Sequence, residues 1–130
     1  MICVDSDCVI DLLKNRKEAI AIVDKYKDSL VTTEISVFET FFGIYNKRDF
    51  PKDDENSTRE FFNSIEVLSM SRGCGKIAAK IMAELYKKGE PIGQNDCFIV
   101  SIMKKNGIGS IITKNRKHFS RIKGIEVISY

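Results

Sequence analysis

The sequence predicts an α/β fold with a mainly parallel central sheet. Short apolar runs alternate along the chain with longer segments whose apolar residues recur at helical spacing. The short runs are largely apolar rather than alternating with polar residues, which is typical of strands covered on both faces. Helices that lie between successive strands act as crossovers, and strands joined by crossovers pair in parallel.

The N-terminal half contains two predicted strands and four predicted helices. Met1–Val4 is an apolar run that indicates a buried strand, and Asp5–Asp7 follows it as a cluster of helix-capping residues. Apolar residues over Val9–Leu13 then continue at helical spacing. The other elements of this half are a helix over Arg16–Asp28, a strand over Leu30–Thr32, a helix over Ile35–Tyr45 and a helix from Pro51 to Ser64.

The C-terminal half contains three predicted strands and two predicted helices. Gly89 closes a helix over Gly75–Lys88, and Gly107 closes a helix over Gly93–Lys105, because glycine readily takes the positive φ that ends many helices. The strands of this half are Val67–Leu68, Ser110–Thr113 and Glu126–Ile128.

Length and composition indicate one domain over residues 1–130. Apolar residues make up 43% and charged residues 30% of the chain, which excludes the disordered and collagen-like classes. No apolar stretch reaches the roughly 18 residues of a membrane span. Three aspartates lie within residues 1–15, where a signal peptide would need an uninterrupted apolar run. The four cysteines form no C-x-x-C pair, which disfavours a zinc site and indicates reduced thiols. We therefore expect a soluble, cytoplasmic protein.

Positive charge is concentrated towards the C-terminal end. Residues 104–130 hold seven basic side chains against Glu126 alone, a balance of +6, so residues 1–103 sum to −3 within a total of +3. A basic segment beside an acidic body suggests a polyanionic partner positioned near carboxylates. Ordinary solvated lysines would give the same composition, so both interpretations stay open.

Three carboxylates occupy positions where a surface charge is not expected. Glu39 is the only charged residue of the helix over Ile35–Tyr45, and Asp96 is the only charge within residues 93–103. Asp5 ends a buried strand, at the edge where parallel sheets bind ligands. The alternatives are a surface glutamate, a first-turn aspartate at a helix N-terminus and a helix N-cap, respectively.

One α/β topology brings these three carboxylates to a common edge of the sheet. Carboxylates packed together raise one another's pKa unless a cation neutralises them. Mg²⁺ or Mn²⁺, held by carboxylates, water and substrate phosphate, is the natural partner of such a group. The chemistry that this arrangement favours is hydrolysis of a phosphate ester.

Four motifs carry a resemblance to a known family over the whole chain. Asp5 lies in V-D-S-D-C-V-I-D-L-L, Glu39 in T-T-E-I-S-V-F-E-T-F-F-G, and Asp96 in G-Q-N-D-C-F-I-V. The fourth motif, I-I-T-K-N-R-K-H-F, contains Thr113 and Asn115. In this order and spacing, the motifs resemble the PIN-domain ribonucleases, and most closely the VapC-type toxins of toxin–antitoxin pairs.

The resemblance implies a PIN-like three-layer sandwich, with helices flanking the sheet, and a Mg²⁺- or Mn²⁺-dependent endoribonuclease. It also implies a homodimer and a cognate antitoxin that covers or disrupts the metal site. By the same resemblance, Asp5, Glu39 and Asp96 would hold the metal, and Asn115 would complete the catalytic set by placing a second metal or the attacking water. An amide is a weaker metal ligand than a carboxylate, so it stays open whether the site holds one metal ion or two.

Further residues around this set also take roles from the resemblance. Asp7 would shape the site from behind the metal ligands, and Ser36 and Thr113 would donate hydrogen bonds to a carboxylate or a phosphate. The RNA backbone would be held by three basic residues, which makes binding salt-dependent and largely independent of sequence. These residues are Lys114, Arg116 and Lys117.

Two other functions stay open at this point. V-D-S-D-C-V also fits the D-x-D-x-[TV] motif of haloacid-dehalogenase-like phosphatases, with Asp5 as nucleophile and Asp7 as general acid. Those phosphatases also need paired aspartates after a later strand, and none follows Ser110–Thr113. The second alternative is a non-catalytic PIN-like binding protein, which only Asn115 supports. His118 is interpreted as a partly exposed helix residue rather than a catalytic one.

Overall fold

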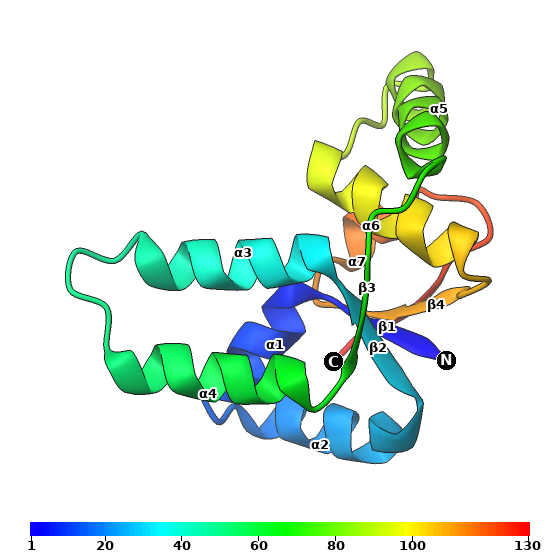
Figure 1. The fold of residues 1–130 in the computed structure, drawn as a ribbon. Coiled ribbons are helices and arrows are strands. Elements are labelled where there is room, and N and C mark those ends of the chain that lie inside the picture. The colour runs from blue at the N-terminus through cyan, green and yellow to red at the C-terminus, as the bar shows by residue number, and fades with distance from the viewer.

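A computed structural model describes residues 1–130 and is built around a five-stranded sheet (Figure 1). The strands lie in the order β3-β2-β1-β4-β5, and every neighbouring pair is parallel. The predicted α/β class is therefore confirmed, with a sheet that is parallel throughout. The strands are β1 (Ile2–Val4), β2 (Leu30–Thr33), β3 (Glu66–Leu68), β4 (Ser110–Ile112) and β5 (Glu126–Ile128).

The helices follow the predicted order closely. Both ends of α3, α4, α5 and α6 lie within one residue of the predicted bounds, because each of these helices has a periodic apolar face and a clear stop. A short 3-10 helix, η1 (Lys27–Ser29), extends α2. The α-helices are α1 (Ser6–Leu13), α2 (Lys17–Tyr26), α3 (Glu34–Tyr45), α4 (Lys52–Asn63), α5 (Cys74–Lys87), α6 (Gln94–Lys105) and α7 (Arg116–Phe119).

Two apolar cores, one on each face of the sheet, give the molecule three layers. Cys3 packs into the core beneath α5 and α6, whereas its neighbour Val4 packs into the core beneath α1, α2 and α4. Ile111 and Ile112 in β4 divide between the two cores in the same way. Successive side chains of a strand point to opposite faces, so apolar runs in β1 and β4 need helices on both sides. This arrangement confirms the predicted three-layer sandwich.

The carboxyl ends of the central strands come together at one edge of the sheet. Val4 in β1 is in register with Ile112 in β4, and the Asp5 N–H donates to the Ile112 carbonyl at 3.0 Å. The residues directly after β1 and β4 are therefore neighbours, although they lie more than a hundred positions apart in sequence. None of the helices combines the length and the apolar character that a membrane span requires.

Candidate active site

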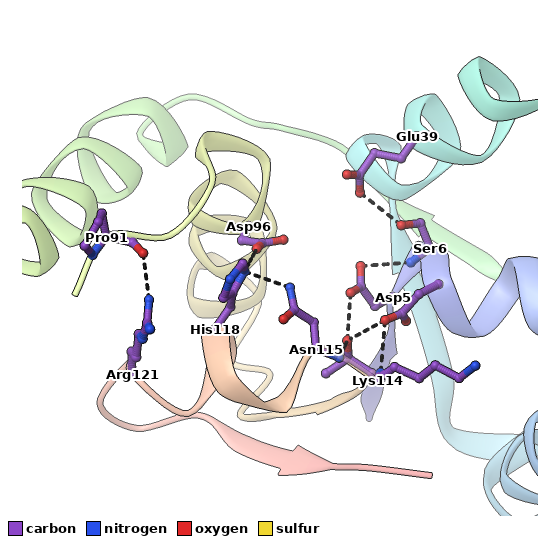
Figure 2. A network of polar contacts seen from close by, with 11 residues as sticks. Asp5, Ser6, Glu39, Pro91, Asp96, Lys114, Asn115, His118 and Arg121 are labelled. Carbon is purple, nitrogen blue, oxygen red and sulfur yellow. Dashed lines mark hydrogen bonds and ion pairs between the residues drawn. The ribbon is translucent and has the colours of Figure 1, made fainter. Parts of the chain in front are cut away.

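Asp5 lies at the centre of a polar network at this edge (Figure 2). It is the N-cap of α1, and its Oδ1 accepts from the Ser6 N–H at 2.8 Å. Its Oδ2 accepts from the Thr113 hydroxyl at 2.9 Å. The side chain is only 5% exposed, and burial, with Asp7 and Asp96 nearby, raises its pKa from 3.8 to about 8. Asp5 is a carboxylate that its surroundings disfavour in the charged form.

Thr113 links Asp5 to Asp7. Its hydroxyl lies 2.9 Å from Asp5 Oδ2 and 3.1 Å from Asp7 Oδ2, but a hydroxyl has one hydrogen to donate. The Lys114 N–H donates to Asp7 Oδ2 at 3.0 Å, and the Asn115 N–H donates to the Thr113 hydroxyl oxygen at 2.9 Å. Asp7 Oδ1 is buried and has no hydrogen-bond partner. The network therefore holds more acceptor oxygens than the chain's own donors satisfy.

Glu39 approaches the same edge from α3. Its Oε1 accepts from the Ser6 hydroxyl at 3.1 Å, so Ser6 connects Glu39 to the N-terminus of α1. Partial burial and the neighbouring charges of Asp96 and Asp7 raise the Glu39 pKa, although hydrogen bonds from Ser6 and Asn95 work in the opposite direction. The helix face around Glu39 is therefore not an ordinary solvated surface.

Ser36 lies one turn before Glu39, inside the first turn of α3. Thr33 is the N-cap of this helix, and its hydroxyl accepts from the Ser36 N–H at 3.2 Å. The Ser36 hydroxyl is fully buried and lies 3.4 Å from the Thr33 hydroxyl. Its side-chain contact is thus with the helix cap and not with a carboxylate.

Asp96 projects from the first turn of α6 and contacts His118, which in turn contacts Asn115. His118 Nδ1 lies 3.2 Å from Asp96 Oδ2, and Asn115 Nδ2 lies 2.8 Å from the same His118 nitrogen (Figure 2). Burial raises the Asp96 pKa, while the contact with His118 lowers it. An open hollow of about 500 Å³ lies beside this group, lined by Glu39, Gly93, Gln94, Asn95 and Asp96 without any apolar residue.

His118 is the contact that the sequence interpretation missed. It was expected to be a partly exposed helix residue, and its side chain is indeed 38% exposed, but its ring is directed at Asp96. The available signal was its spacing: His118 follows Asn115 by three positions, which places both side chains on one side of a helical turn.

The three basic residues after β4 differ in their surroundings. Lys114 forms an ion pair with Asp11, and its Nζ lies 5.6 Å from the centre of the Tyr130 ring. Arg116 and Lys117 are exposed at the start of α7, and neither forms an ion pair. The Lys114 side chain is thus directed away from Asp96 (Figure 2), whereas the Arg116 and Lys117 side chains are exposed and unpaired.

The chemistry of these residues suits a hard divalent cation. As arranged here, no three acidic, histidine or cysteine side chains lie close enough together to hold a metal ion. The donors are nevertheless carboxylate oxygens: burial raises the pKa of Asp5 and Glu39, the charges of Asp7 and Asp96 raise it further, and one buried oxygen, Asp7 Oδ1, lacks a partner. A cation with oxygen ligands would relieve both the repulsion and the unsatisfied acceptor.

Comparison with protein families gives a match to the PIN domain over residues 2–125, almost the whole chain. The chain belongs to the PIN-domain family. The tRNA(fMet)-specific endonuclease VapC of Salmonella typhimurium is 27% identical to this PIN domain over 124 residues, which cover 95% of this chain and 92% of that protein. Ribonuclease VapC2 of Haemophilus influenzae is 24% identical over 119 residues, covering 91% and 89%. The resemblance to VapC-type toxins is confirmed.

Solved structures show the same PIN fold at lower sequence identity. VapBC2 from Rickettsia felis, bound to a DNA fragment from its promoter, matches with a TM-score of 0.87 and 19% identity over 100% of this chain and 99% of that chain. DNA-bound VapBC from Salmonella typhimurium matches with a TM-score of 0.85 and 22% identity over 98% and 96%. The five-stranded parallel sheet and its flanking helices are therefore an arrangement shared with these chains.

Proposed function

We propose that this PIN-domain chain is a metal-dependent endoribonuclease that hydrolyses RNA phosphodiester bonds, and that it acts as the toxin of a toxin–antitoxin pair. The observation that carries the proposal is that Asp5, Glu39 and Asp96 lie around one edge of the sheet, where burial above all raises the pKa of each carboxyl. The names of the similar VapC proteins support RNA as the substrate.

In this proposal, Asp5, Glu39 and Asp96 hold Mg²⁺ or Mn²⁺. When bound, such a cation stabilises negative charge on the phosphoryl oxygens and makes water a better nucleophile. Thr113 holds the Asp5 carboxylate from behind, and Ser6 holds Glu39 in the same manner. These hydrogen bonds fix the ligand oxygens before the substrate arrives, so little reorganisation is needed during the reaction.

Substrate binding is assigned to the basic residues around α7. Arg116 and Lys117 are exposed and free to contact backbone phosphates, and Asn115, which precedes them, can hydrogen-bond water or a phosphate oxygen. Lys114 would join them only by leaving Asp11. Phosphate contacts of this kind fix the position of the RNA but do not read its sequence.

Protein partners are assigned to an exposed aromatic surface on α3. Phe38 and Phe42 are 58% and 56% exposed and stack on one another at 5.9 Å, and Tyr45 continues the surface. Exposed aromatic side chains that lie side by side are typical of protein–protein contacts. We therefore propose that the chain forms a homodimer and binds a cognate antitoxin. We further propose that residues 1–130 are one PIN domain and that the protein acts in the cytoplasm.

The phosphatase alternative is not favoured by the residues that follow β4. Those phosphatases need paired aspartates after a later strand, whereas Lys114 and Asn115 lie beyond β4 here. Asp7, which would be the general acid, accepts from the Lys114 N–H and lies 3.1 Å from the Thr113 hydroxyl. The non-catalytic alternative rests on Asn115 alone, whereas the three raised carboxyl pKa values favour an intact site.

The test is cleavage of end-labelled structured RNA by the purified, antitoxin-free chain with Mn²⁺ or with EDTA. Asp96→Asn removes one proposed ligand, and Asp24→Asn, at an exposed position of α2, is the matched control. We expect cleavage by the wild type and the control in Mn²⁺, and none by Asp96→Asn or in EDTA. A folded wild-type chain that never cuts RNA at any metal concentration would refute the nuclease.

A further inference from the structure

Two polar groups, one of them the proposed metal ligand Asp96, meet at a single nitrogen of His118. His118 Nδ1 lies 3.2 Å from Asp96 Oδ2 and 2.8 Å from Asn115 Nδ2. A ring nitrogen has either one hydrogen to donate or one lone pair to accept with, so Nδ1 cannot bond as a donor to Asp96 and as an acceptor from Asn115 at the same time. The lone pairs of Asp96 Oδ2 and His118 Nδ1 repel each other unless a cation, either a proton or a metal ion, lies between them.

We infer that His118 Nδ1 is a metal ligand next to Asp96, and that this nitrogen makes the site prefer Mn²⁺ and other imidazole-binding transition ions to Mg²⁺. The inference deepens the proposed function, because it rests on the metal site assigned there. Imidazole is a good ligand for first-row transition ions, whereas Mg²⁺ takes carboxylate, carbonyl and water oxygens.

The spacing of the donors fits such a role. His118 Nδ1 and Asp96 Oδ2 are 3.2 Å apart, so both atoms would be able to hold one ion together. Rotating the Asn115 side-chain amide by a half turn would put its oxygen where its nitrogen lies. This oxygen would then be a third possible metal ligand beside His118 Nδ1. The helix that carries Asp96 is anchored in the core by the buried side chains of Ile99, Val100 and Met103. Asp96 is therefore held on a rigid element.

Metal affinity of the full chain, freed of metal with a chelator, tests the selectivity. Isothermal titration with Mn²⁺ and with Mg²⁺ is compared for the wild type, His118→Gln and His118→Glu. Loss of a residue that only hydrogen-bonds a metal ligand lowers metal affinity roughly tenfold or more, so loss of a direct ligand should lower it at least as much. We expect His118→Gln to weaken Mn²⁺ at least tenfold while Mg²⁺ changes less than threefold, and His118→Glu to shift the preference towards Mg²⁺.

Ser120→Ala is the matched control, because Ser120 is exposed at the end of the same helix, α7. It should leave both affinities unchanged, and circular dichroism checks that every variant keeps the helical content of the wild type. An equal loss of Mn²⁺ and Mg²⁺ affinity in His118→Gln, or no loss of either, would overturn the assignment of a selective ligand.

The wild-type chain gives a second test that needs no variant. His118 is the only histidine of the sequence, so a ¹⁵N spectrum of the chain shows the two ring nitrogens of one residue. Zn²⁺, a diamagnetic ion that accepts imidazole, should shift the Nδ1 resonance at one equivalent. An unchanged Nδ1 resonance, whether Zn²⁺ binds elsewhere or does not bind, would overturn the inference.

These outcomes separate the inference from the proposed nuclease. RNA cleavage that depends on Asp96, together with an unchanged Nδ1 resonance, would refute only the ligand role of His118. A His118-dependent Mn²⁺ preference in a chain that never cuts RNA would refute only the nuclease.

Discussion

The metal-free chain should lose stability as pH rises, because of the surroundings of Asp5. Burial, together with Asp7 and Asp96, raises the Asp5 pKa from 3.8 to about 8 in the folded chain. Since the raised pKa belongs to the folded state, this carboxyl carries no penalty below pH 3.8, and its penalty grows as pH rises towards 8. At about 1.36 kcal/mol for each unit, the free energy of unfolding at pH 7 is lower by roughly 4 kcal/mol.

Asp5→Asn removes this ionisation and keeps the shape of the side chain. The amide gives up one acceptor towards Thr113, which costs about 1 kcal/mol. In the absence of metal, the variant should therefore be more stable than the wild type by ~3 kcal/mol at neutral pH. For a domain of this size, that corresponds to a rise in melting temperature on the order of 10 °C. Saturating Mn²⁺ should stabilise the wild type and leave the variant nearly unchanged.

Thermal unfolding in EDTA from about pH 5 to pH 9, repeated with Mn²⁺, measures both effects. The control is again Asp24→Asn, which exchanges the same groups on an exposed helix face and should follow the wild type at every pH. The reasoning fails if wild-type stability is flat between pH 5 and pH 8 in EDTA. It also fails if Asp5→Asn melts at or below the wild-type temperature throughout that range.

Three further substitutions test neighbouring contacts. Thr113→Val removes the only hydroxyl between Asp5 and Asp7 and should lower the free energy of unfolding by about 1–3 kcal/mol in urea denaturation at neutral pH. Joint replacement of Arg116 and Lys117 by glutamine should reduce the slope of log Kd for RNA against log salt by about 1–2, measured by fluorescence anisotropy with an uncleaved RNA. Tyr130→Phe removes the hydroxyl that donates to Asp11 Oδ2 at 2.9 Å, so the free energy of unfolding in urea should fall by about 1 kcal/mol. The salt dependence of RNA binding should stay as in the wild type.

The elements of the fold were predictable because each is specified by a local pattern. The helix that carries Glu39 has an apolar face at helical spacing and a threonine cap, Thr33, so its bounds follow from adjacent residues. The strands that precede Asp5 and Thr113 are short apolar runs, which in an α/β chain indicate burial on both faces. The meeting of these residues at one edge then follows from parallel pairing.

The contacts within the site were less predictable because they depend on side-chain directions across long separations. Lys114 and Asp11 are 103 positions apart, and nothing in the basic run after β4 distinguishes the paired lysine from the free Arg116 and Lys117. The sequence predicts a hydrogen bond from Ser36 to a carboxylate or a phosphate, but burial in the first turn of α3 places its hydroxyl beside the helix cap. Spacing places a residue on an element, whereas packing decides what its side chain contacts.

The four-residue helix α7 shows how the core sets the chemistry at the surface. Phe119 is fully buried in the core beneath α5 and α6, and it fixes the rotation of α7 about its axis. With Phe119 inward, His118 is directed at Asp96, while Arg116 and Lys117 stay in solvent. A helix of one turn has little stability of its own, so this orientation depends on the buried ring. The same apolar contact thus places a ring nitrogen beside the Asp96 carboxylate and leaves two unpaired cations exposed on α7, where they can contact RNA phosphates.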